Sequence, residues 1–329
     1  MKLIKLLALA FIITSCLIAN DDRPPIAYDF LAKKEVQSFI DMMIKKYHFK
    51  RSYMTSVLKN AKLDRDTLAR YTGKYKVGST NGPWERYKAH VLDPITLEKA
   101  KRFKKDYYET LLRASKQYKV DMNYIVGFMA VESKFGEYTG DYNVVDALAS
   151  LAFHKNRMKK LFKSEFKHLF LFAREKAYDI NALEGSFAGA MGCVQQLPSI
   201  ARKHKSDFDA DGVTDLWDIE DCIGSIAKFM HENKWKKGMP AAVRTNFQGG
   251  RYRKTLKPSR KKLRFLSTIE DYGIKPAQHF PQSKAYLLRI RNKTHDDIYL
   301  GTSNFRILLR YNNATTYGMA IHLIAEHVK

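Results

Sequence analysis

The chain has 329 residues, 45% of them hydrophobic, with 58 Lys and Arg against 34 Asp and Glu, which gives a net charge of +24. This length and hydrophobicity allow two or three domains with sizeable cores and exclude a chain too polar to bury one. The positive charge suggests an anionic polymer or a membrane face as a neighbour. Nucleic acid is not the expected partner, because no zinc-finger spacing, RNA-binding strand signature or continuous basic helix is present.

The N-terminus has the pattern of an export signal. Two lysines precede an apolar stretch at residues 6–13, which is too short to span a bilayer. The aliphatic and small residues that lead to Cys16 resemble a bacterial lipoprotein processing site. We therefore expect a signal peptide at 1–15 and a lipidated tether at 16–34, on a periplasmic protein anchored to the outer membrane. The alternative is ordinary cleavage near Ala19, which leaves a soluble periplasmic protein.

Helical periodicity begins after the tether. It runs from about Glu35 to Tyr71 and is interrupted by a turn near His48. Residues 74–83 have no periodicity and contain three glycine or proline breaks, so we expect a loop there. We assign residues 35–95 to an N-terminal helical domain. The expected buried positions are Val36, Phe39, Ile40, Met43, Ile44, Met54, Val57 and Leu58.

Further helices are expected through the middle and at the end of the chain. Pro94 begins one that is predicted to reach about Tyr118. Others are predicted at 144–152, 161–177 and 223–230, and helical pattern returns at 304–328. The expected inward positions of the first are Leu97, Ala100, Phe103, Tyr107, Leu111 and Leu112.

A different pattern separates the last two of these helices. Short segments alternate between residues 243 and 300, prolines interrupt them, and basic residues crowd between Arg251 and Arg264. This predicts a small β-rich insert. The expected fold is mainly α (α+β), with a helical core at 96–242, the insert at 243–300 and a C-terminal helical segment at 301–329.

One buried helix carries an acid. The sequence YIVGFMAVESKFG, from Tyr124 to Gly136, predicts a helix that is buried on most of its surface and stops at Gly136. Glu132 lies near its carboxyl end, where apolar neighbours and the negative helix end both raise the pKa of its carboxyl group. A carboxyl group that stays protonated near neutral pH can donate a proton to a leaving oxygen. The alternative is a surface glutamate paired with Lys134.

Small residues dominate GSFAGAMGCVQQLPS, residues 185–199. They allow the backbone to approach another helix or a flat ligand closely. Ser186 and Gln195 are the polar groups in this wall, and the Gln195 amide suits sugar hydroxyls and acetamido groups. Helix packing and a binding site both explain the pattern.

The sequence DFDADGVTDLWD, residues 207–218, matches the calcium loop of an EF-hand. Acids fill positions 1, 3, 5, 9 and 12, and Gly212 fills position 6. Because the last residue leads directly into a helix, we expect a structural Ca²⁺ site; the alternative is an acidic turn without a metal. The expected ligands are Asp207, Asp209, Asp211, the Val213 carbonyl, Asp215 and Asp218.

Two shorter features remain. YNNATTY, from Tyr311 to Tyr317, offers aromatic faces and amide groups of the kind that bind sugars, although Asn and Thr also favour helix starts. Apart from the lipidated Cys16, the expected mature chain contains Cys193 and Cys222. In an oxidising compartment they can form a disulfide, and two buried thiols are the alternative.

Together these motifs resemble the membrane-bound lytic murein transglycosylase B family, the family 3 lytic transglycosylases. The resemblance extends from about Val36 to the C-terminus and is tightest at 125–235 and 299–328. Five motifs carry it, in the family's order: VESKFG, NVVDALASLAFHKNR, GSFAGAMG, DFDADGVTDLWD followed by CIGSIAKF, and YLGTSNFRILLRYNNATTYGMAI.

The resemblance implies a lysozyme-like helical catalytic core with an EF-hand-type calcium loop, a helical N-terminal part and a small β domain. It implies that Glu132 is the catalytic acid/base. The substrate-cleft positions that it implies are Tyr87, Arg157, Ser186, Gln195, Tyr311, Asn312 and Tyr317.

The chain departs from the family pattern at a few cleft positions. Cys193 and Val194 precede Gln195 where the family usually has an aromatic and a small residue, and Gln196 follows where it has phenylalanine. Phe229 stands where the family often has tyrosine, and Met158 where a second arginine is common. These departures affect subsite contacts rather than the reaction. Cys193 and Cys222 both replace usual family residues, which favours their pairing.

The implied reaction cleaves the β-1,4 bond between N-acetylmuramic acid and N-acetylglucosamine in peptidoglycan glycan strands. Hydrolases usually need two carboxylates, and no second acid is tied to Glu132 in the sequence. We therefore expect a lytic transglycosylase that forms 1,6-anhydromuramyl products with a single acid/base. The alternatives are a hydrolytic muramidase and a non-catalytic, calcium-stabilised peptidoglycan-binding lipoprotein. We expect a monomer that can act beside other cell-wall enzymes.

Overall fold

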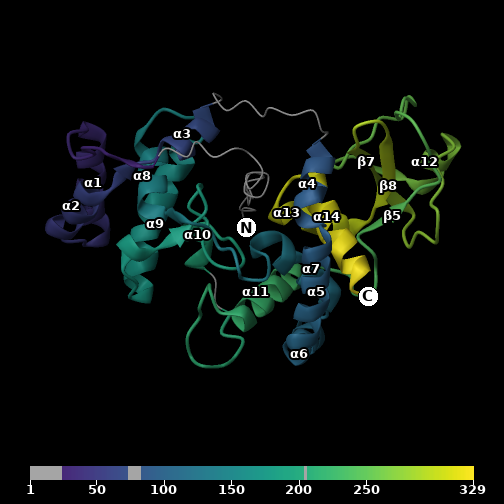
Figure 1. Ribbon diagram of the computed structural model, residues 1–329, viewed down its shortest axis with the longest axis horizontal. Helices are drawn as coiled ribbons and strands as arrows, with labels where there is room; N and C mark the ends of the chain where they lie inside the picture. The colour runs from purple at the N-terminus through teal and green to yellow at the C-terminus, as the bar shows by residue number, and fades with distance from the viewer. Residues whose placement is uncertain (1–23, 73–82, 204–205) are drawn as a thin grey trace.

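The computed structural model describes residues 24–72, 83–203 and 206–329. The expected signal peptide, Cys16 and nearly all of the expected loop at 74–83 lie outside the described residues. Within the described part, no helix combines the length and the hydrophobicity needed to cross a bilayer. Helices predominate, and three hydrophobic cores organise them and a small sheet (Figure 1).

The first helical group joins the N-terminal helices to helices from the middle of the chain. Its elements are α1 (Lys34–Tyr47), α2 (Arg51–Asn60), α3 (Arg65–Thr72), α8 (Val144–Phe153), α9 (Lys159–Lys176), the 3-10 turn Ile180–Ala182 and α10 (Pro198–Ala201). Strand pairs β1 (Ile26–Ala27) with β2 (Lys62–Leu63) and β3 (Tyr142–Asn143) with β4 (Glu184–Gly185) brace it. The predicted turn is confirmed, because His48 ends α1 in the left-handed region at φ 58°.

A stack of phenylalanines fills the core of this group. Phe39 of α1 packs against Phe153 of α8 and against Phe166 and Phe170 of α9. The aromatic stripe of α9 therefore faces α1. Helices α8 and α9 share this core with the N-terminal helices. The domain boundaries expected from the sequence remain predictions.

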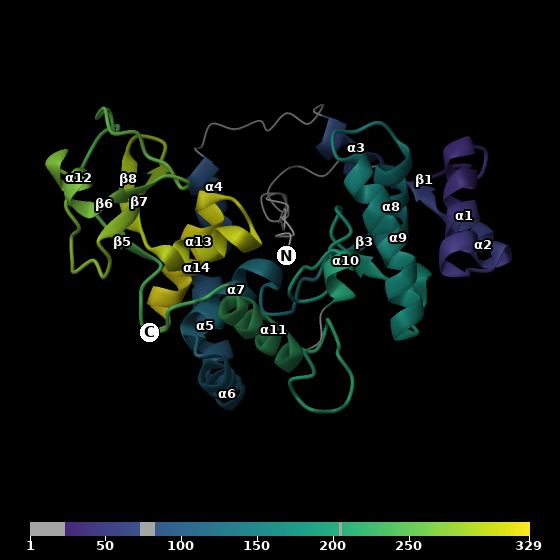
Figure 2. The ribbon, with the colours of Figure 1, turned by 180° about the vertical axis from the view of Figure 1, so that it is seen from behind.

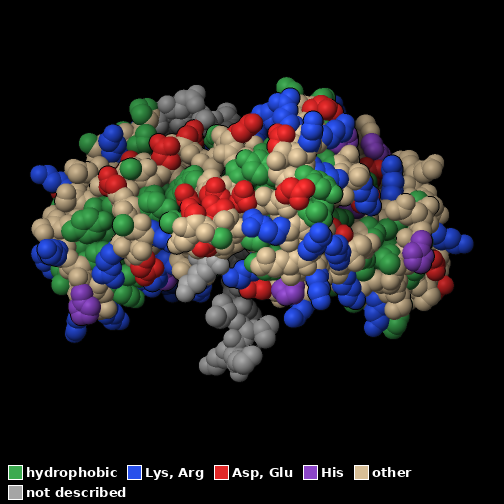
Figure 3. All heavy atoms as spheres, turned by 90° about the horizontal axis from the view of Figure 1, so that it is seen from below, with side chains coloured by type: hydrophobic (Ala, Val, Ile, Leu, Met, Phe, Trp, Pro, Cys, Tyr) green, Lys and Arg blue, Asp and Glu red, His purple; other side chains and the backbone are tan. Residues whose placement is uncertain are grey.

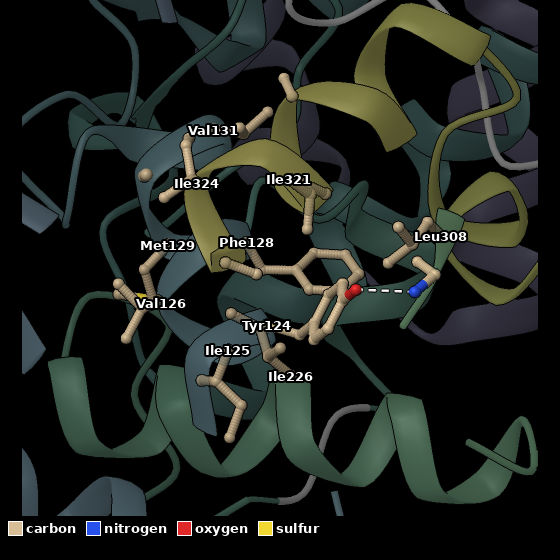
Figure 4. Packing of buried hydrophobic residues seen from close by; sticks show 14 of the residues in the cluster. Tyr124, Ile125, Val126, Phe128, Met129, Val131, Ile226, Leu308, Ile321 and Ile324 are labelled. Carbon is tan, nitrogen blue, oxygen red and sulfur yellow. Dashed lines mark hydrogen bonds between the residues drawn. The ribbon is translucent and has the colours of Figure 1, made fainter. Parts of the chain in front are cut away.

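The second helical group surrounds α7, the helix that carries Glu132. Its elements are α4 (Pro83–Val91), α5 (Pro94–Asp106), α6 (Tyr108–Tyr118), α7 (Met122–Ser133), α11 (Ile219–Glu232), α13 (Ser303–Tyr311) and α14 (Thr315–His327). Figure 4 shows side chains of α7 packed against Ile226 of α11, Leu308 of α13 and Ile321 of α14. Gly127 permits the close crossing of α7 and α14, because a Cβ there would lie 2.7 Å from the Ile321 carbonyl oxygen.

Two predicted boundaries in this group are wrong. The helix expected from Pro94 to Tyr118 breaks at Tyr107, because α5 packs on α7 and α14 whereas α6 packs mainly on α11, and one straight helix cannot cover both. The Glu132 helix ends earlier than Gly136. Lys134 takes the left-handed conformation, at φ 49°, and closes α7.

The predicted β-rich insert is an antiparallel sheet of four strands in the order β5–β8–β7–β6. Its elements are β5 (Ala242–Arg244), β6 (Leu263–Phe265), the short helix α12 (Leu266–Asp271), β7 (Lys284–Arg291) and β8 (Asp296–Gly301). One face of the sheet covers its own small core with Ala285 and Leu287, and Leu288 and Ile290 join the core of the second helical group. The sheet and the first helical group lie at opposite ends of the molecule (Figure 2).

Candidate active site

Glu132 lies in the last turn of α7 and is 7% exposed. Burial raises the pKa of its carboxyl group from 4.5 to about 8, and a hydrogen bond from Tyr317 acts in the opposite direction. The alternative of a surface glutamate paired with Lys134 does not hold, since the described structure contains no ion pair between them. The carboxyl group is therefore protonated at neutral pH.

Two tyrosines from the C-terminal segment pack beside this carboxyl group. The Tyr317 hydroxyl donates to Glu132 Oε1, and the ring of Tyr311 stacks on that of Tyr317 with centroids 6.5 Å apart. The Tyr311 hydroxyl donates to the Val194 carbonyl oxygen. Burial raises the pKa of both tyrosines well above the usual value, so both hydroxyls keep their protons.

A cavity of about 300 Å³ opens beside Glu132. Three predicted site residues line it: Glu132, Ser186 and Gln195. The carboxyl group therefore combines burial by protein atoms with access to a partly open cavity. This combination suits a group that must hold a proton and then deliver it to a bound molecule.

The loop between β4 and α10 forms one wall of this cavity. Gly189 and Gly192 adopt φ of +75° and +72°, and added Cβ atoms would lie 2.5 Å from Leu148 Cγ and 2.3 Å from the Leu216 carbonyl oxygen. The small residues therefore allow this loop to pack tightly against its neighbours, and the same loop also lines the cavity. Gln195, at φ 46°, is held by donating to the carbonyl oxygens of Thr139, at 2.6 Å, and Gly192, at 3.0 Å.

The other predicted cleft residues lie outside the cavity wall. Tyr87 is buried in the same hydrophobic core as Tyr317. Asn312 is buried, and its Oδ1 accepts no hydrogen bond within the described structure. Arg157 is exposed and lies over the Tyr71 ring at 5.7 Å, on the first helical group. The structure therefore brings Tyr311 and Tyr317 to Glu132, and Arg157 is not among the residues that line the cavity.

Sequence reasoning missed several residues that line the cavity. Arg70 of α3 donates to Asp66 Oδ2 at 2.8 Å, and its guanidinium lies 4.8 Å from the Phe187 ring centroid. His90 also faces the cavity, and burial together with the nearby Lys134 charge lowers its pKa. Nothing in the periodicity of α3 or α4 singles these residues out, because only the tertiary fold brings them to α7.

The acidic loop brings three carboxylates together. Oxygen atoms of Asp207, Asp209 and Asp221 lie within 4.8 Å of one another, and hard anionic oxygens of this kind suit Ca²⁺. Gly212 turns the loop at φ +87°, and its N–H donates to Asp207 Oδ2 at 3.1 Å. Figure 3, which views the molecule from below, shows a group of acidic side chains near the middle of that face. In Figure 1 the acidic loop lies below α10.

The remaining predicted ligands have other contacts. Asp218 caps α11 by accepting from the Asp221 N–H at 2.9 Å, and Asp211 and Asp215 accept from the N–H groups of Val213 and Trp217. Asp221 was not predicted, because it follows the twelve-residue pattern by three positions. It lies beside Asp207 and Asp209, since the first turn of α11 directs it back into the loop.

A disulfide joins Cys193 to Cys222, so the pairing that the sequence left open is present. Cys193 lies in the cavity-wall loop, two residues before Gln195, and Cys222 directly follows Asp221. The bond therefore ties the active-site loop to the start of α11 and to the acidic loop.

Comparisons with known proteins agree with this geometry. Residues 31–326 match the family model described as the transglycosylase SLT domain. The chain is 34% identical over 308 residues to membrane-bound lytic murein transglycosylase B of Escherichia coli strain K12, covering 91% of this chain and 84% of that protein.

Solved structures of similar proteins share the fold. The Escherichia coli lytic transglycosylase Slt35, solved with bulgecin A, is 33% identical with a TM-score of 0.83, over 92% of this chain and 95% of that one. The same enzyme in complex with calcium gives a TM-score of 0.82 at 33% identity over the same shares. Soluble lytic transglycosylase SltB1 of Pseudomonas aeruginosa is 26% identical, covers 89% and 98%, and gives 0.75. The predicted mainly helical fold with a lysozyme-like core is confirmed.

Proposed function

The chain belongs to the family of lytic murein transglycosylases with a transglycosylase SLT domain, and from this premise we propose that Glu132 is the single acid/base of its reaction. The enzyme cleaves peptidoglycan in a lyase-type reaction. The observation that carries the assignment of Glu132 is its burial beside an open cavity, with a carboxyl pKa of about 8.

Glu132 acts first as an acid and then as a base. It donates its proton to the glycosidic oxygen of the β-1,4 bond between N-acetylmuramic acid and N-acetylglucosamine, and that bond breaks. The acetamido group of the substrate stabilises the positive centre. The Glu132 carboxylate then takes the proton of the muramyl 6-hydroxyl, whose oxygen forms the new bond to C1 and closes a 1,6-anhydro ring. The proton count balances without water.

The protein stabilises both forms of Glu132. Burial favours the protonated acid before cleavage, and the Tyr317 hydroxyl stabilises the carboxylate after it. Tyr311, Asn312, Ser186 and Gln195 are the proposed sugar contacts near this carboxyl group. For Tyr87 and Arg157 we keep the role of more distant substrate contacts.

The alternative mechanism is hydrolysis with a second carboxylate. Asp141 is the other acid that lines the described cavity, and it is exposed and accepts from the Tyr138 hydroxyl at 3.3 Å. Glu132 is buried whereas Asp141 is exposed, so the two acids do not form a matched pair. Glu132 alone is therefore the better assignment.

Mass spectrometry of digested sacculi tests the reaction. The expected soluble products end in 1,6-anhydromuramyl residues. Products heavier by one water per cut would assign the enzyme as a hydrolytic muramidase instead. If the protein binds sacculi but releases no product, it is the non-catalytic peptidoglycan-binding lipoprotein of the alternative interpretation.

We also propose a structural Ca²⁺ held by Asp207, Asp209 and Asp221, with Asp211, the Val213 carbonyl and Asp215 as further ligands. The three clustered carboxylates support this assignment, as does the calcium complex of Slt35. Asp218 keeps its capping role. The metal's contribution is charge neutralisation that fixes the loop next to the active-site wall.

For location we propose the periplasm, with a lipid on Cys16 that anchors the enzyme to the outer membrane. The processing pattern at Cys16 supports this, and a relative at 34% identity is named as membrane-bound. Glycan strands of peptidoglycan are the proposed substrate, and a monomer is sufficient because one chain supplies every residue of the site.

A further inference from the structure

The segment between β5 and β7 is strongly basic and lies outside the active-site cavity. From residue 251 to residue 291 the sequence contains two acids, Glu270 and Asp271. Basic residues crowd the same stretch, and those that matter here are Lys257, Lys261, Lys262, Arg264 and Lys284. No part of the proposed reaction uses them.

Hydrogen bonds hold this segment in one shape. Arg264 Nη2 donates to the Lys257 carbonyl oxygen at 2.8 Å. Ser259 Oγ accepts from the N–H groups of Lys261 and Lys262, at 3.2 and 3.1 Å, and the Ser259 N–H donates to the Leu287 carbonyl oxygen at 2.7 Å. The exposed lysines therefore project from an ordered turn on the sheet.

Two apolar side chains are exposed on the same edge. Leu263 and Phe265 belong to β6, the edge strand, and are 46% and 56% exposed. They pair with Tyr286 and Lys284 of β7, so they lie on one face of the sheet. Lys284 Nζ lies 4.3 Å from the centroid of the Phe265 ring.

The cations on this edge have no carboxylate partner among the residues that the structure describes. Within the described structure, none of Lys257, Lys261, Lys262, Arg264 and Lys284 lies within ion-pair distance of a carboxylate. By contrast, Arg244 and Arg251 of the same domain pair with Asp297 and Asp296. The charge of the edge is therefore available to an external anion.

We propose that this basic edge, formed by Lys257, Lys261, Lys262, Leu263, Phe265 and Lys284, binds the surface of an anionic lipid bilayer. Lysines attract phosphate headgroups, and exposed Leu and Phe side chains enter the interface below them. A soluble acidic polymer would use the cations but would leave the two apolar side chains in water. The pairing of both kinds of side chain favours the bilayer.

The edge is joined to the active-site end of α13. Arg260 Nε donates to Asn313 Oδ1 at 3.2 Å, and Arg306 Nη1 donates to the Arg260 carbonyl oxygen at 3.3 Å. Asn313 follows Asn312, a proposed sugar contact. A bilayer bound at the edge therefore fixes the active site close to the membrane, independently of any N-terminal lipid and of the role of Glu132.

Vesicle sedimentation tests this proposal. The full chain carries Cys16→Ser, so that no lipid contributes, and is mixed with phosphatidylglycerol–phosphatidylcholine vesicles or with phosphatidylcholine alone. Lys261→Gln with Lys262→Gln should lower partitioning onto the anionic vesicles about 30-fold, because each lysine contributes ~1 kcal/mol of attraction to the anionic surface. Leu263→Ser with Phe265→Ser should weaken the binding that remains at high salt. Turnover of soluble glycan should not change in either variant.

The matched control is Lys45→Gln with Lys46→Gln, two exposed lysines in the last turn of α1, at the far end of the molecule from β6 (Figure 2). It removes the same charge and should leave partitioning within about threefold of the parent. Equal losses in both pairs would reduce the effect to net charge and overturn the proposal. If the lysine substitutions lower binding to sacculi instead of vesicles, the edge binds acidic peptidoglycan peptides. If the Cys16→Ser protein itself does not bind anionic vesicles, the proposal is wrong.

Discussion

The pKa of Glu132 results from two opposing effects of its surroundings. Burial disfavours the carboxylate and raises the pKa to about 8, while the Tyr317 hydroxyl donates to the carboxylate and lowers it. Burial is the larger effect. The acid form therefore predominates below about pH 8 and is lost as the pH rises through that value.

Glu132→Gln should lower turnover of sacculi by about 100- to 10,000-fold, because it removes the proton that the glycosidic oxygen needs. Binding of glycan strands should survive, since the amide keeps the size of the side chain. The matched control is Asp141→Asn, which should keep turnover within about tenfold. Product release and sacculus pull-down measure the two properties, and a dead Asp141→Asn enzyme would point to two carboxylates.

The same substitution should change how stability depends on pH. The pKa is 4.5 in the reference state and about 8 in the folded protein, so the unfolded chain loses its proton first. Wild-type stability therefore falls between pH 4.5 and 8, by about 4 to 5 kcal/mol from this group. The melting temperature of Glu132→Gln relative to wild type should rise across that window, and a constant difference would contradict the buried, neutral carboxyl group.

Tyr317→Phe should shift the alkaline limb of the kcat profile to higher pH. The substitution removes the hydroxyl that stabilises the carboxylate, so the pKa of Glu132 rises further. The ring keeps its stacking on Tyr311, which limits the loss of packing. Profiles of kcat against pH for the two proteins measure the shift, and a limb at lower pH would mean that Tyr317 acts on another group.

At the scale of elements, the acidic loop and α11 form one unit. Asp218 caps the helix, and Asp221, one turn later, faces Asp207 and Asp209. Asp221 also accepts from the Asp215 N–H at 2.7 Å, so it holds the loop even before a cation binds. In the calcium site that we propose, the closing ligand therefore comes from the helix rather than from the end of the twelve-residue pattern.

Asp221→Asn should abolish the rise in melting temperature that Ca²⁺ produces, because one of three clustered carboxylates is lost. The matched variant, Asp218→Asn, should keep that rise, since asparagine caps helices about as well as aspartate. Melting curves with calcium and with a chelator measure both. If Asp218→Asn abolishes the rise and Asp221→Asn keeps it, Asp218 is the closing ligand, as predicted from the sequence.

At the scale of the whole molecule, the chain crosses between the two helical groups beside the active site. Met191 belongs to the first core and Cys193 to the second, and Leu216 and Cys222 are divided in the same way. The Cys193–Cys222 disulfide ties these two crossings together. Both cysteines belong to the second core, so the bond fixes the cavity-wall loop to the start of α11 within that group.

Cys193→Ala with Cys222→Ala should lower the free energy of unfolding by about 3 to 4 kcal/mol, because the bond closes a loop of 29 residues. Urea denaturation measures this. Wild type treated with a reductant is the control and should unfold at the urea concentration of the double variant. Equal midpoints for oxidised wild type and the variant would show that the bond contributes nothing to stability.

Local patterns predicted the parts of this protein that depend on neighbours in sequence. The apolar run around Glu132, the turn near His48, the helix that follows Asp218 and the alternation in the insert all depend on a few neighbouring residues, and the structure contains each of them. The break at Tyr107 was not predictable in this way, because it depends on which helices α5 and α6 contact.

The sequence by itself determined that a buried helix ends in one acid, that an acidic loop precedes α11, and that five motifs occur in a family's order. Only the tertiary structure decided that Tyr317 donates to Glu132, that Arg70 and His90 line the cavity, that Asp221 joins Asp207 and Asp209, and that the two cysteines pair. The physical reason is the separation along the chain of the residues that interact. Helix propensity and turn chemistry act between near neighbours, whereas a pKa, a ligand set and a disulfide depend on atoms that folding brings together from distant parts of the chain.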